Sequence, residues 1–217
     1  MKILAYHSIG DRVKEAGAGF YCVSEDAFRH QIEYLRGKDV MITFDDGDIT
    51  NYTKAYPILK EFGIKAHFFI ICGWVGAPGY MNWEQIKELS DSGMIIGSHG
   101  MTHRILTELN DVELYHELRE SKRVLEENLS CSIDTLSIPR GFCSQKVMNK
   151  ATEIGYKTIF TSDDRIVVRS DWDLDRFISV INNGPSLMDK AKELIKKSAR
   201  RTLGDRNYDK IRSGLLR

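Results

Sequence analysis

The chain is 217 residues long, and its 31 lysines and arginines balance 31 aspartates and glutamates, so the formal net charge is zero. This length fits one large α/β domain, and a balanced charge argues against a nucleic-acid partner. The four cysteines at positions 22, 72, 131 and 143 lie far apart without a CxxC pair, which indicates reduced thiols, with two disulfides as the alternative.

Strand-like and helix-like segments alternate along the chain. Strands are predicted at residues 3–6, 40–44, 66–71, 94–97, 135–138, 158–161 and 178–181. Helices are predicted from the N-cap Ser24 to about Gly37 and at residues 50–62, 83–92, 111–128, 144–155 and 185–203. Such alternation is typical of βαβ units on a parallel sheet. The fold class is therefore α/β, close to a closed α/β barrel, with an open doubly wound sheet as the alternative.

An apolar run at residues 40–44 ends abruptly at two adjacent carboxylates, Asp45 and Asp46, which Gly47 follows. Runs of this kind are typical of buried parallel strands. The chain turns where such a strand ends, so both carboxylates can point into one site. Two carboxylates side by side repel each other, and at least one of them needs a cation. Active sites in these folds gather at the carboxyl edge of the sheet, which makes this pair the first candidate.

His99 and His103 follow the predicted strand at residues 94–97, at the same edge of the sheet. Their spacing of four lets a helical or turn-like backbone place both imidazoles on one face. Two neutral imidazoles and one carboxylate make a three-ligand metal site with positions open for water and substrate. Surface or core histidines are the alternative for an isolated pair, but the nearby double aspartate favours a metal. The donor set suits Zn²⁺, with Co²⁺, Ni²⁺ or Fe²⁺ as alternatives.

The segments TFDDG at residues 43–47 and SHGMTH at residues 98–103 resemble the first two motifs of the polysaccharide deacetylase family, the NodB-type carbohydrate esterases. Their flanks, NYTKAYPILKEFGIKAHFFI and MNWEQIKELSDSGMIIG, resemble the family too. The resemblance covers about residues 3–181 and implies a single-domain, distorted (β/α)7-type barrel that removes acetyl groups from sugars with a metal. By motif, it implies that Asp46, His99 and His103 are the metal ligands and that Asp45 is the catalytic base.

The chain departs from the family pattern in two places. Most members carry a proton-donating histidine near the C-terminal end, but this chain has no histidine after His116. The Tyr6-His7 pair resembles the start of a circularly permuted branch, which implies that His7 is the general acid; packing at a strand end is the alternative. The third motif usually carries an arginine that tethers the base, and here Ser137 fills that position.

Four further residues are candidates for substrate binding. Pro139, Arg140 and Gly141 follow the predicted strand at residues 135–138, where the backbone can donate to an oxyanion and the arginine can bind substrate or a carboxylate. A surface arginine beside a turn proline is the alternative for Arg140. Trp172 resembles the tryptophan of the fourth family motif and can stack on the face of a sugar, with core packing as the alternative.

The two ends of the chain bear on location and partners. The stretch before His7 is too short for a signal peptide, and no later stretch can span a bilayer, so we expect a cytoplasmic protein. We assign residues 1–184 to the barrel and residues 185–217 to a basic helical extension, because residues 190–217 carry ten basic and three acidic side chains. This extension can contact a membrane surface or a lipid-linked glycan, with a solvated helix on the barrel as the alternative.

Together these features favour a metal-dependent hydrolase that removes an acetyl group from an N-acetylated sugar. Its substrate would be an oligosaccharide or a lipid-linked or nucleotide-linked glycan precursor. One alternative is a catalytically idle relative that binds glycan or assists its assembly, which the absent C-terminal histidine and Ser137 motivate. The other alternative is a hydrolase of a non-sugar amide.

Overall fold

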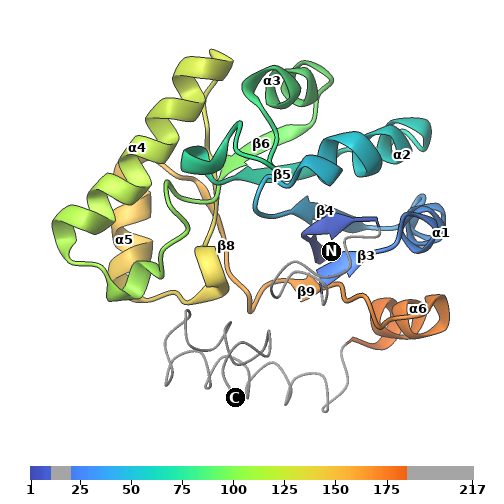
Figure 1. The fold of residues 1–217 in the computed structure, drawn as a ribbon. Helices are drawn as coiled ribbons and strands as arrows, with labels where there is room; N and C mark the ends of the chain where they lie inside the picture. The colour runs from blue at the N-terminus through green and yellow to red at the C-terminus, as the bar shows by residue number, and fades with distance from the viewer. Residues whose placement is uncertain (11–20, 185–217) are drawn as a thin grey trace, which may run out of the picture.

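The computed structural model describes residues 1–10 and 21–184. The predicted helix at residues 185–203 and the basic extension at residues 185–217 lie outside these described residues. Seven parallel strands form one curved sheet with helices packed along its outer side (Figure 1). In sheet order they are β8 (Thr158–Phe160), β7 (Thr135–Ser137), β6 (Ile95–Ser98), β5 (Ala66–Ile70), β4 (Val40–Phe44), β1 (Lys2–Tyr6) and β9 (Ile166–Val167).

Helices connect most of these strands, as the sequence predicts. They are α1 (Glu25–Leu35), α2 (Tyr56–Glu61), α3 (Trp83–Asp91), α4 (Asp111–Leu129), α5 (Gln145–Ile154) and α6 (Leu174–Asn183). A small parallel sheet of β2 (Ser8–Ile9) and β3 (Cys22–Val23) follows the end of β1. Within the described residues, β8 and β9 are the two edge strands, so the curved sheet is a half-barrel that stays open between them. The predicted single-domain, distorted (β/α)7-type barrel is confirmed.

The strand predicted at residues 178–181 is wrong, because this segment lies inside α6 and the seventh strand is β9. Asp173 caps α6 by accepting a hydrogen bond from a backbone N–H of the first turn. The buried residues Phe177, Val180 and Ile181 recur at helical spacing. A short apolar run fits both a strand and one face of a helix, and here the cap and the spacing select the helix.

The predicted helix at residues 50–62 is divided into two parts. A π-helical turn, Asn51–Ala55, comes first, and α2 follows it directly. Pro57 lies in the first turn of α2, where its missing N–H removes no hydrogen bond within the helix. The proline therefore marks the start of an α-helix, and the irregular π-helical turn lies before it, next to the end of β4.

An aromatic layer packs against the central strands near their carboxyl ends. Tyr6 of β1, Phe44 of β4 and Phe68 of β5 are fully buried, as is Phe28 of α1. Ring centroids lie 5.5 Å apart for Tyr6 and Phe44 and 4.9 Å apart for Phe44 and Phe68. Burial of side chains of this size stabilises the fold by about 1.5–3 kcal/mol each. Because Tyr6, Phe44 and Phe68 are partners in the ladder, the residues after them emerge side by side.

A second aromatic cluster lies on the opposite face of the sheet, since neighbouring residues of a strand alternate between faces. The Phe69 and Phe160 rings lie 5.1 Å apart, and the His67 ring lies 5.6 Å from Phe160. Gly97 makes this packing possible, because a Cβ there would lie 2.6 Å from the Phe69 ring. Any larger residue at this position would displace Phe69.

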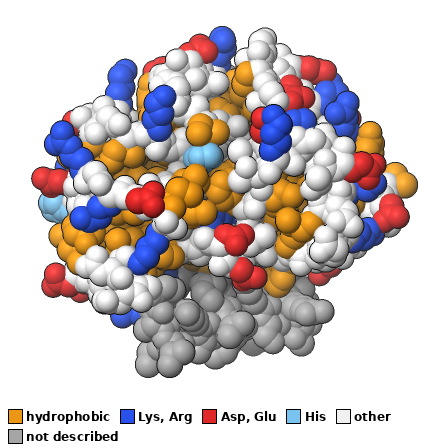
Figure 2. Space-filling model, turned by 180° about the vertical axis from the view of Figure 1, so that it is seen from behind, with side chains coloured by type: hydrophobic (Ala, Val, Ile, Leu, Met, Phe, Trp, Pro, Cys, Tyr) orange, Lys and Arg blue, Asp and Glu red, His pale blue; other side chains and the backbone are white. Residues whose placement is uncertain are grey.

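The surface mixes both signs of charge. Figure 2 shows the face opposite to that of Figure 1, where hydrophobic side chains gather around a histidine and where lysines and arginines alternate with aspartates and glutamates. This alternation matches the zero net charge of the whole chain. Among the helices that the structure describes, none combines the length and the apolar character needed to cross a bilayer.

Candidate metal centre

Strained backbone gathers at the carboxyl edge of the sheet. Asp46 after β4, His103 after β6 and Arg140 after β7 have positive φ angles of 74°, 62° and 60°. Among the described residues, Ser130 is the only other non-glycine residue in this conformation, and it caps α4. A positive φ costs about 1–3 kcal/mol for a residue with a Cβ, and such strain clusters at functional sites. The strained residues therefore mark one candidate site.

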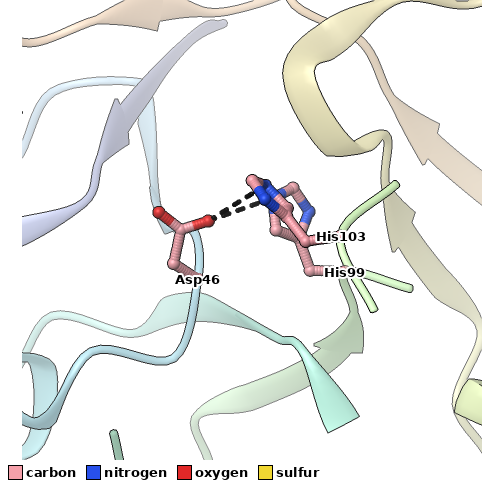
Figure 3. Close-up of side chains that lie close together, drawn as sticks. All are labelled: Asp46, His99 and His103. Carbon is pink, nitrogen blue, oxygen red and sulfur yellow. Dashed lines mark ion pairs between the residues drawn. The ribbon is translucent and has the colours of Figure 1, made fainter. Parts of the chain in front are cut away.

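Asp46, His99 and His103 point toward one another from the ends of β4 and β6 (Figure 3). One ligand atom from each residue lies within 4.8 Å of the others. Asp46 Oδ1 lies 3.4 Å from Nε2 of each histidine. One oxygen and two imidazole nitrogens at these separations fit a divalent ion such as Zn²⁺, and three ligands leave a position open. The structure thus brings together the three residues that the sequence predicts as metal ligands.

Hydrogen bonds and charges prepare this cluster for a cation. His99 Nδ1 lies 2.9 Å from the carbonyl oxygen of Ser137 and donates to it, which turns Nε2 toward Asp46. Burial lowers the pKa of His103 to about 3, so its imidazole is neutral at pH 7, as a metal ligand must be. Burial alone would raise the pKa of Asp46, but its interactions with His99 and His103 outweigh it and lower that pKa.

Asp45 is held away from the cluster by a different set of contacts. Its side chain is only 5% exposed, Oδ1 accepts a hydrogen bond of 2.7 Å from Arg165 Nη1, and Oδ2 accepts one of 3.2 Å from Ser137 Oγ. Burial would raise the pKa of Asp45, but the Arg165 charge and the nearby His99 outweigh it and lower that pKa. Asp45 is therefore an ionised carboxylate with a fixed direction, as a general base requires.

Arg165 is the main site residue that the sequence analysis misses. It lies in the connection between β8 and β9 and reaches the site with a side chain that is 4% exposed. Its Nη2 donates to Ser137 Oγ over 2.9 Å, and its Nε donates to the Thr161 carbonyl oxygen over 3.3 Å. The sequence offers only an indirect signal: the buried Asp45 needs a cation, and the family arginine is replaced by Ser137.

His7 lies at the end of β1, next to the two carboxylates. Its neighbour Tyr6 pairs with Phe44 in the ladder, so His7 emerges beside Asp45. The His7 ring stacks on Tyr21 with centroids 4.8 Å apart, and the His7 carbonyl accepts a hydrogen bond of 2.6 Å from Asn51 Nδ2. Burial lowers the pKa of His7, while the charges of Asp46 and Asp45 oppose that shift. The structure thus places His7 at the predicted edge and within electrostatic range of both carboxylates.

The predicted substrate residues divide into two groups. Pro139, Arg140 and Gly141 form a turn directly after β7, and the Arg140 charge contributes to the low pKa of His103, so this turn borders the cluster. Trp172 is 5% exposed and packs in the hydrophobic core. A side chain so deeply buried favours the core alternative, and the substrate role of Trp172 stays a prediction.

An aromatic pair beside the cluster provides the exposed surface that Trp172 lacks. The Trp74 ring lies 5.4 Å from the His103 ring and 5.0 Å from the Tyr80 ring, and both aromatic residues are partly exposed. The turn that carries Trp74 is joined to the loop of residues 99–103, called here the histidine loop, by a hydrogen bond of 2.8 Å from Gly73 N to the Met101 carbonyl. The sequence analysis assigns no role to this loop, because tryptophan and tyrosine in a glycine-rich segment have no distinctive spacing.

A buried carboxylate of α4 holds the histidine loop through hydrogen bonds. Glu117 is 4% exposed and accepts hydrogen bonds from the backbone N–H and the hydroxyl of Thr102, the residue before His103. Since His103 already has a strained backbone, these contacts fix the loop that presents its imidazole. Position 117 lies on the buried face of α4 with Leu114, Leu118 and Ser121, but a glutamate is usually exposed, so the role of Glu117 emerges only from the structure.

With this geometry, the comparison with known proteins identifies the family. The family model described as polysaccharide deacetylase matches residues 33–159, which is more than half of the chain. The protein belongs to the polysaccharide deacetylase family.

Two curated relatives share this assignment in their names. The Bacillus subtilis protein YxkH, which its name places among the polysaccharide deacetylases, is 33% identical over 58% of this chain and 45% of its own. The poly-beta-1,6-N-acetyl-D-glucosamine N-deacetylase of Staphylococcus aureus is 28% identical over 68% of this chain and 63% of its own. The chain therefore spans about half to three fifths of the length of these relatives.

Solved structures share the fold. The Streptococcus pyogenes deacetylase PplD in complex with acetate superposes with a TM-score of 0.73 at 22% identity and covers 82% of this chain and 96% of its own. IcaB from Ammonifex degensii has a TM-score of 0.72 at 23% identity and covers 85% of this chain and 97% of its own. At these identities the likeness concerns the fold, and the circular permutation stays a prediction.

Proposed function

We propose that this protein removes the acetyl group of an N-acetylated sugar by metal-dependent hydrolysis. The observation that carries the proposal is the division of labour between two neighbouring carboxylates. Asp46 joins His99 and His103, whereas Arg165 holds Asp45 apart from them. Family membership supports the same reaction, and the Staphylococcus aureus relative is named for poly-beta-1,6-N-acetyl-D-glucosamine. A short β-linked N-acetylglucosamine oligosaccharide is therefore the first substrate to test.

Asp46, His99 and His103 would hold the divalent ion, for which Zn²⁺ is our first choice. A divalent ion supplies positive charge that polarises the acetyl carbonyl and lowers the pKa of water. The protein contributes the direction of the ligands. The His99 hydrogen bond to the Ser137 carbonyl sets its tautomer, and Glu117 fixes the loop of His103.

The remaining side chains handle the protons. Asp45 accepts the proton of the attacking water as its oxygen bonds to the acetyl carbon. His7 then donates a proton to the sugar nitrogen as the carbon–nitrogen bond breaks, which releases acetate and a free amine. Burial lowers the pKa of His7, and the charges of Asp46 and Asp45 oppose this shift toward the protonated form that this step requires. Tyr21 and Asn51 hold His7 in place from two sides.

The sugar itself would stack beside the ion. Pyranose rings have apolar faces that pack on aromatic side chains, and the Trp74 and Tyr80 rings lie next to His103. The turn of Pro139, Arg140 and Gly141, which also borders His103, can contact the acetyl group or a sugar hydroxyl. The cytoplasmic location and the contact of residues 185–217 with a membrane or lipid-linked glycan stay predictions.

Two observations argue against the alternative of a catalytically idle relative. A guanidinium from Arg165 reaches the base although Ser137 replaces the family arginine, and His7 lies beside Asp45 although the C-terminal histidine is missing. A hydrolase of a non-sugar amide has no specific observation in its favour, because the same metal and base would serve either substrate.

The test measures acetate release by the zinc-loaded protein from β-1,6-linked and β-1,4-linked N-acetylglucosamine oligosaccharides, a nucleotide-linked N-acetylglucosamine and a small cyclic amide. We expect release from an oligosaccharide, loss of release with a chelator, and a fall of about 10²–10⁴-fold in D45N. D91N is the matched control, because Asp91 is an exposed carboxylate paired with Lys87. No acetate from any sugar, or full activity of D45N, would contradict the proposal.

A further inference from the structure

We infer that Arg165 is the positioning residue of this site, which keeps the Asp45 carboxylate directed at the substrate and off the metal. The inference rests on the proposed function and adds the device that separates the two carboxylates. Arg165 reaches the site from the connection between β8 and β9, far along the chain from β4. Ser137, at the end of β7, leaves the space that the guanidinium fills.

Arg165, Ser137 and Asp45 form a closed ring of hydrogen bonds. Arg165 Nη1 donates to Asp45 Oδ1 over 2.7 Å, Arg165 Nη2 donates to Ser137 Oγ over 2.9 Å, and Ser137 Oγ donates to Asp45 Oδ2 over 3.2 Å. Both carboxylate oxygens therefore have a fixed partner, and the carboxylate cannot rotate without breaking a charge-assisted bond. Asp45 directly precedes Asp46, so without this restraint it is close enough to compete for the same ion.

The guanidinium is itself held in place. Its Nε donates to the Thr161 carbonyl, and its Cζ lies 6.0 Å from the centre of the Phe69 ring. The Thr161 backbone N–H and hydroxyl both donate to Asp164, which stiffens this connection. An arginine anchored at its Nε in this way presents its two Nη groups in one direction, which a flexible lysine does not.

A second buried arginine, Arg169, pairs with a carboxylate of a different kind. Arg169 lies four residues further along the chain and is 8% exposed, but Asp171, with which it pairs two residues later, is 54% exposed. The Arg165 pair is buried on both sides, with exposed fractions of 4% and 5%. Full burial of an ion pair is a poor source of stability, because the desolvation cost rivals the attraction. The burial of the Arg165–Asp45 pair is therefore better explained by the fixed direction it gives the Asp45 carboxylate than by a contribution to the stability of the fold.

Ser137 couples the base to the metal cluster. Its hydroxyl bridges Arg165 and Asp45, while its carbonyl accepts from His99 Nδ1. Because Ser137 is fully buried between these groups, an arginine at position 137 and an arginine at position 165 would compete for one space. The guanidinium should therefore work from either element, provided that the other position carries a small residue.

The test compares R165M, R165K, R165S and the exchange variant S137R/R165S, each loaded with zinc. We expect kcat for acetate release to fall about 10²-fold in R165M, while KM and the zinc dissociation constant change by less than about threefold. R165K should keep the fold and remain at least about tenfold slow, because lysine cannot make both contacts. S137R/R165S should be at least about tenfold faster than R165S. R169M is the matched control for the loss of a buried arginine.

A second measurement does not depend on turnover. In crystals of zinc-loaded R165M, the Asp45 carboxylate should leave its original direction, and in S137R/R165S it should return. An unmoved carboxylate in R165M, or R165M and R165K with unchanged kcat, would overturn the inference. Absence of acetate release by the unmodified protein would refute the proposed reaction, and the crystal comparison would then still decide the role of Arg165.

Discussion

Replacement of Glu117 by alanine should weaken metal binding without touching a ligand. Glu117 accepts hydrogen bonds from the Thr102 backbone N–H and from the Thr102 hydroxyl, and its side chain is almost fully buried. The alanine variant leaves the N–H without an acceptor inside the protein, which costs about 1–3 kcal/mol. The hydroxyl can rotate to another partner, so it adds little more than about 1 kcal/mol. We expect the free energy of unfolding to fall by about 2–4 kcal/mol.

The E117A substitution should also lower the affinity for Zn²⁺, because it removes a support of the loop that carries His103. This residue follows Thr102 and holds a positive φ of 62°, a conformation that persists only when its surroundings enforce it. Groups that orient a metal ligand in this way typically contribute about 10–100-fold to affinity. E117A should therefore bind Zn²⁺ about 10–100-fold more weakly, measured by calorimetric titration against a competing chelator.

A control on the same helix separates the two effects. Glu120 lies one turn along α4 and pairs with Arg123 at the surface, so E120A should lose no more than about 1 kcal/mol and bind Zn²⁺ normally. If E117A folds and binds Zn²⁺ as tightly as the unmodified protein, the argument that α4 supports the histidine loop is refuted.

Three further outcomes follow from the structure. W74A should raise KM for an oligosaccharide about tenfold with little change in the zinc dissociation constant, and an unchanged KM would exclude Trp74 as the sugar platform. W172A should lower the free energy of unfolding by about 3–5 kcal/mol, whereas W172F should keep KM within about twofold, so a raised KM in W172F would support its substrate role. Burial lowers the pKa of His67 below its usual 6.5, so the unfolded state takes up a proton first as the pH falls through 6.5. The free energy of unfolding should therefore fall toward lower pH by up to about 1.4 kcal/mol per pH unit. Urea unfolding at pH 7.5 and 5.5 should show a smaller fall for H67F than for the unmodified protein.

The sequence predicts the centre of the site well because strand ends are local features. An apolar run followed by two carboxylates places Asp45 and Asp46 at the end of a strand, and a parallel sheet brings every such end to one edge. The same argument carries His99 and His103 from the end of β6 to Asp46. No long-range knowledge is needed beyond the rule that parallel strands share an edge.

The parts that the sequence does not predict depend on contacts between distant segments. Arg165 meets Asp45 across 120 positions of the chain, and no local pattern distinguishes it from a loop arginine. Trp172 has the residue type of a sugar platform, but the packing around it decides that it is core. The strand prediction at residues 178–181 fails for a different reason. Four apolar-rich residues fit both a strand and one face of a helix, and the N-cap at Asp173 is the signal that favours the helix.

Two adjacent carboxylates can take different roles here because each meets a different positive charge. At the end of β4 the backbone of Asp46 turns to a positive φ of 74°, which directs its carboxylate toward the histidines, while Asp45 continues the strand and meets Arg165. An ion at the histidine cluster would balance one carboxylate, as the guanidinium balances the other, so that neither would need to take up a proton. The proposed base and the proposed metal ligand at consecutive positions therefore require a second cation in the protein, and Arg165 in the connection after β8 provides it.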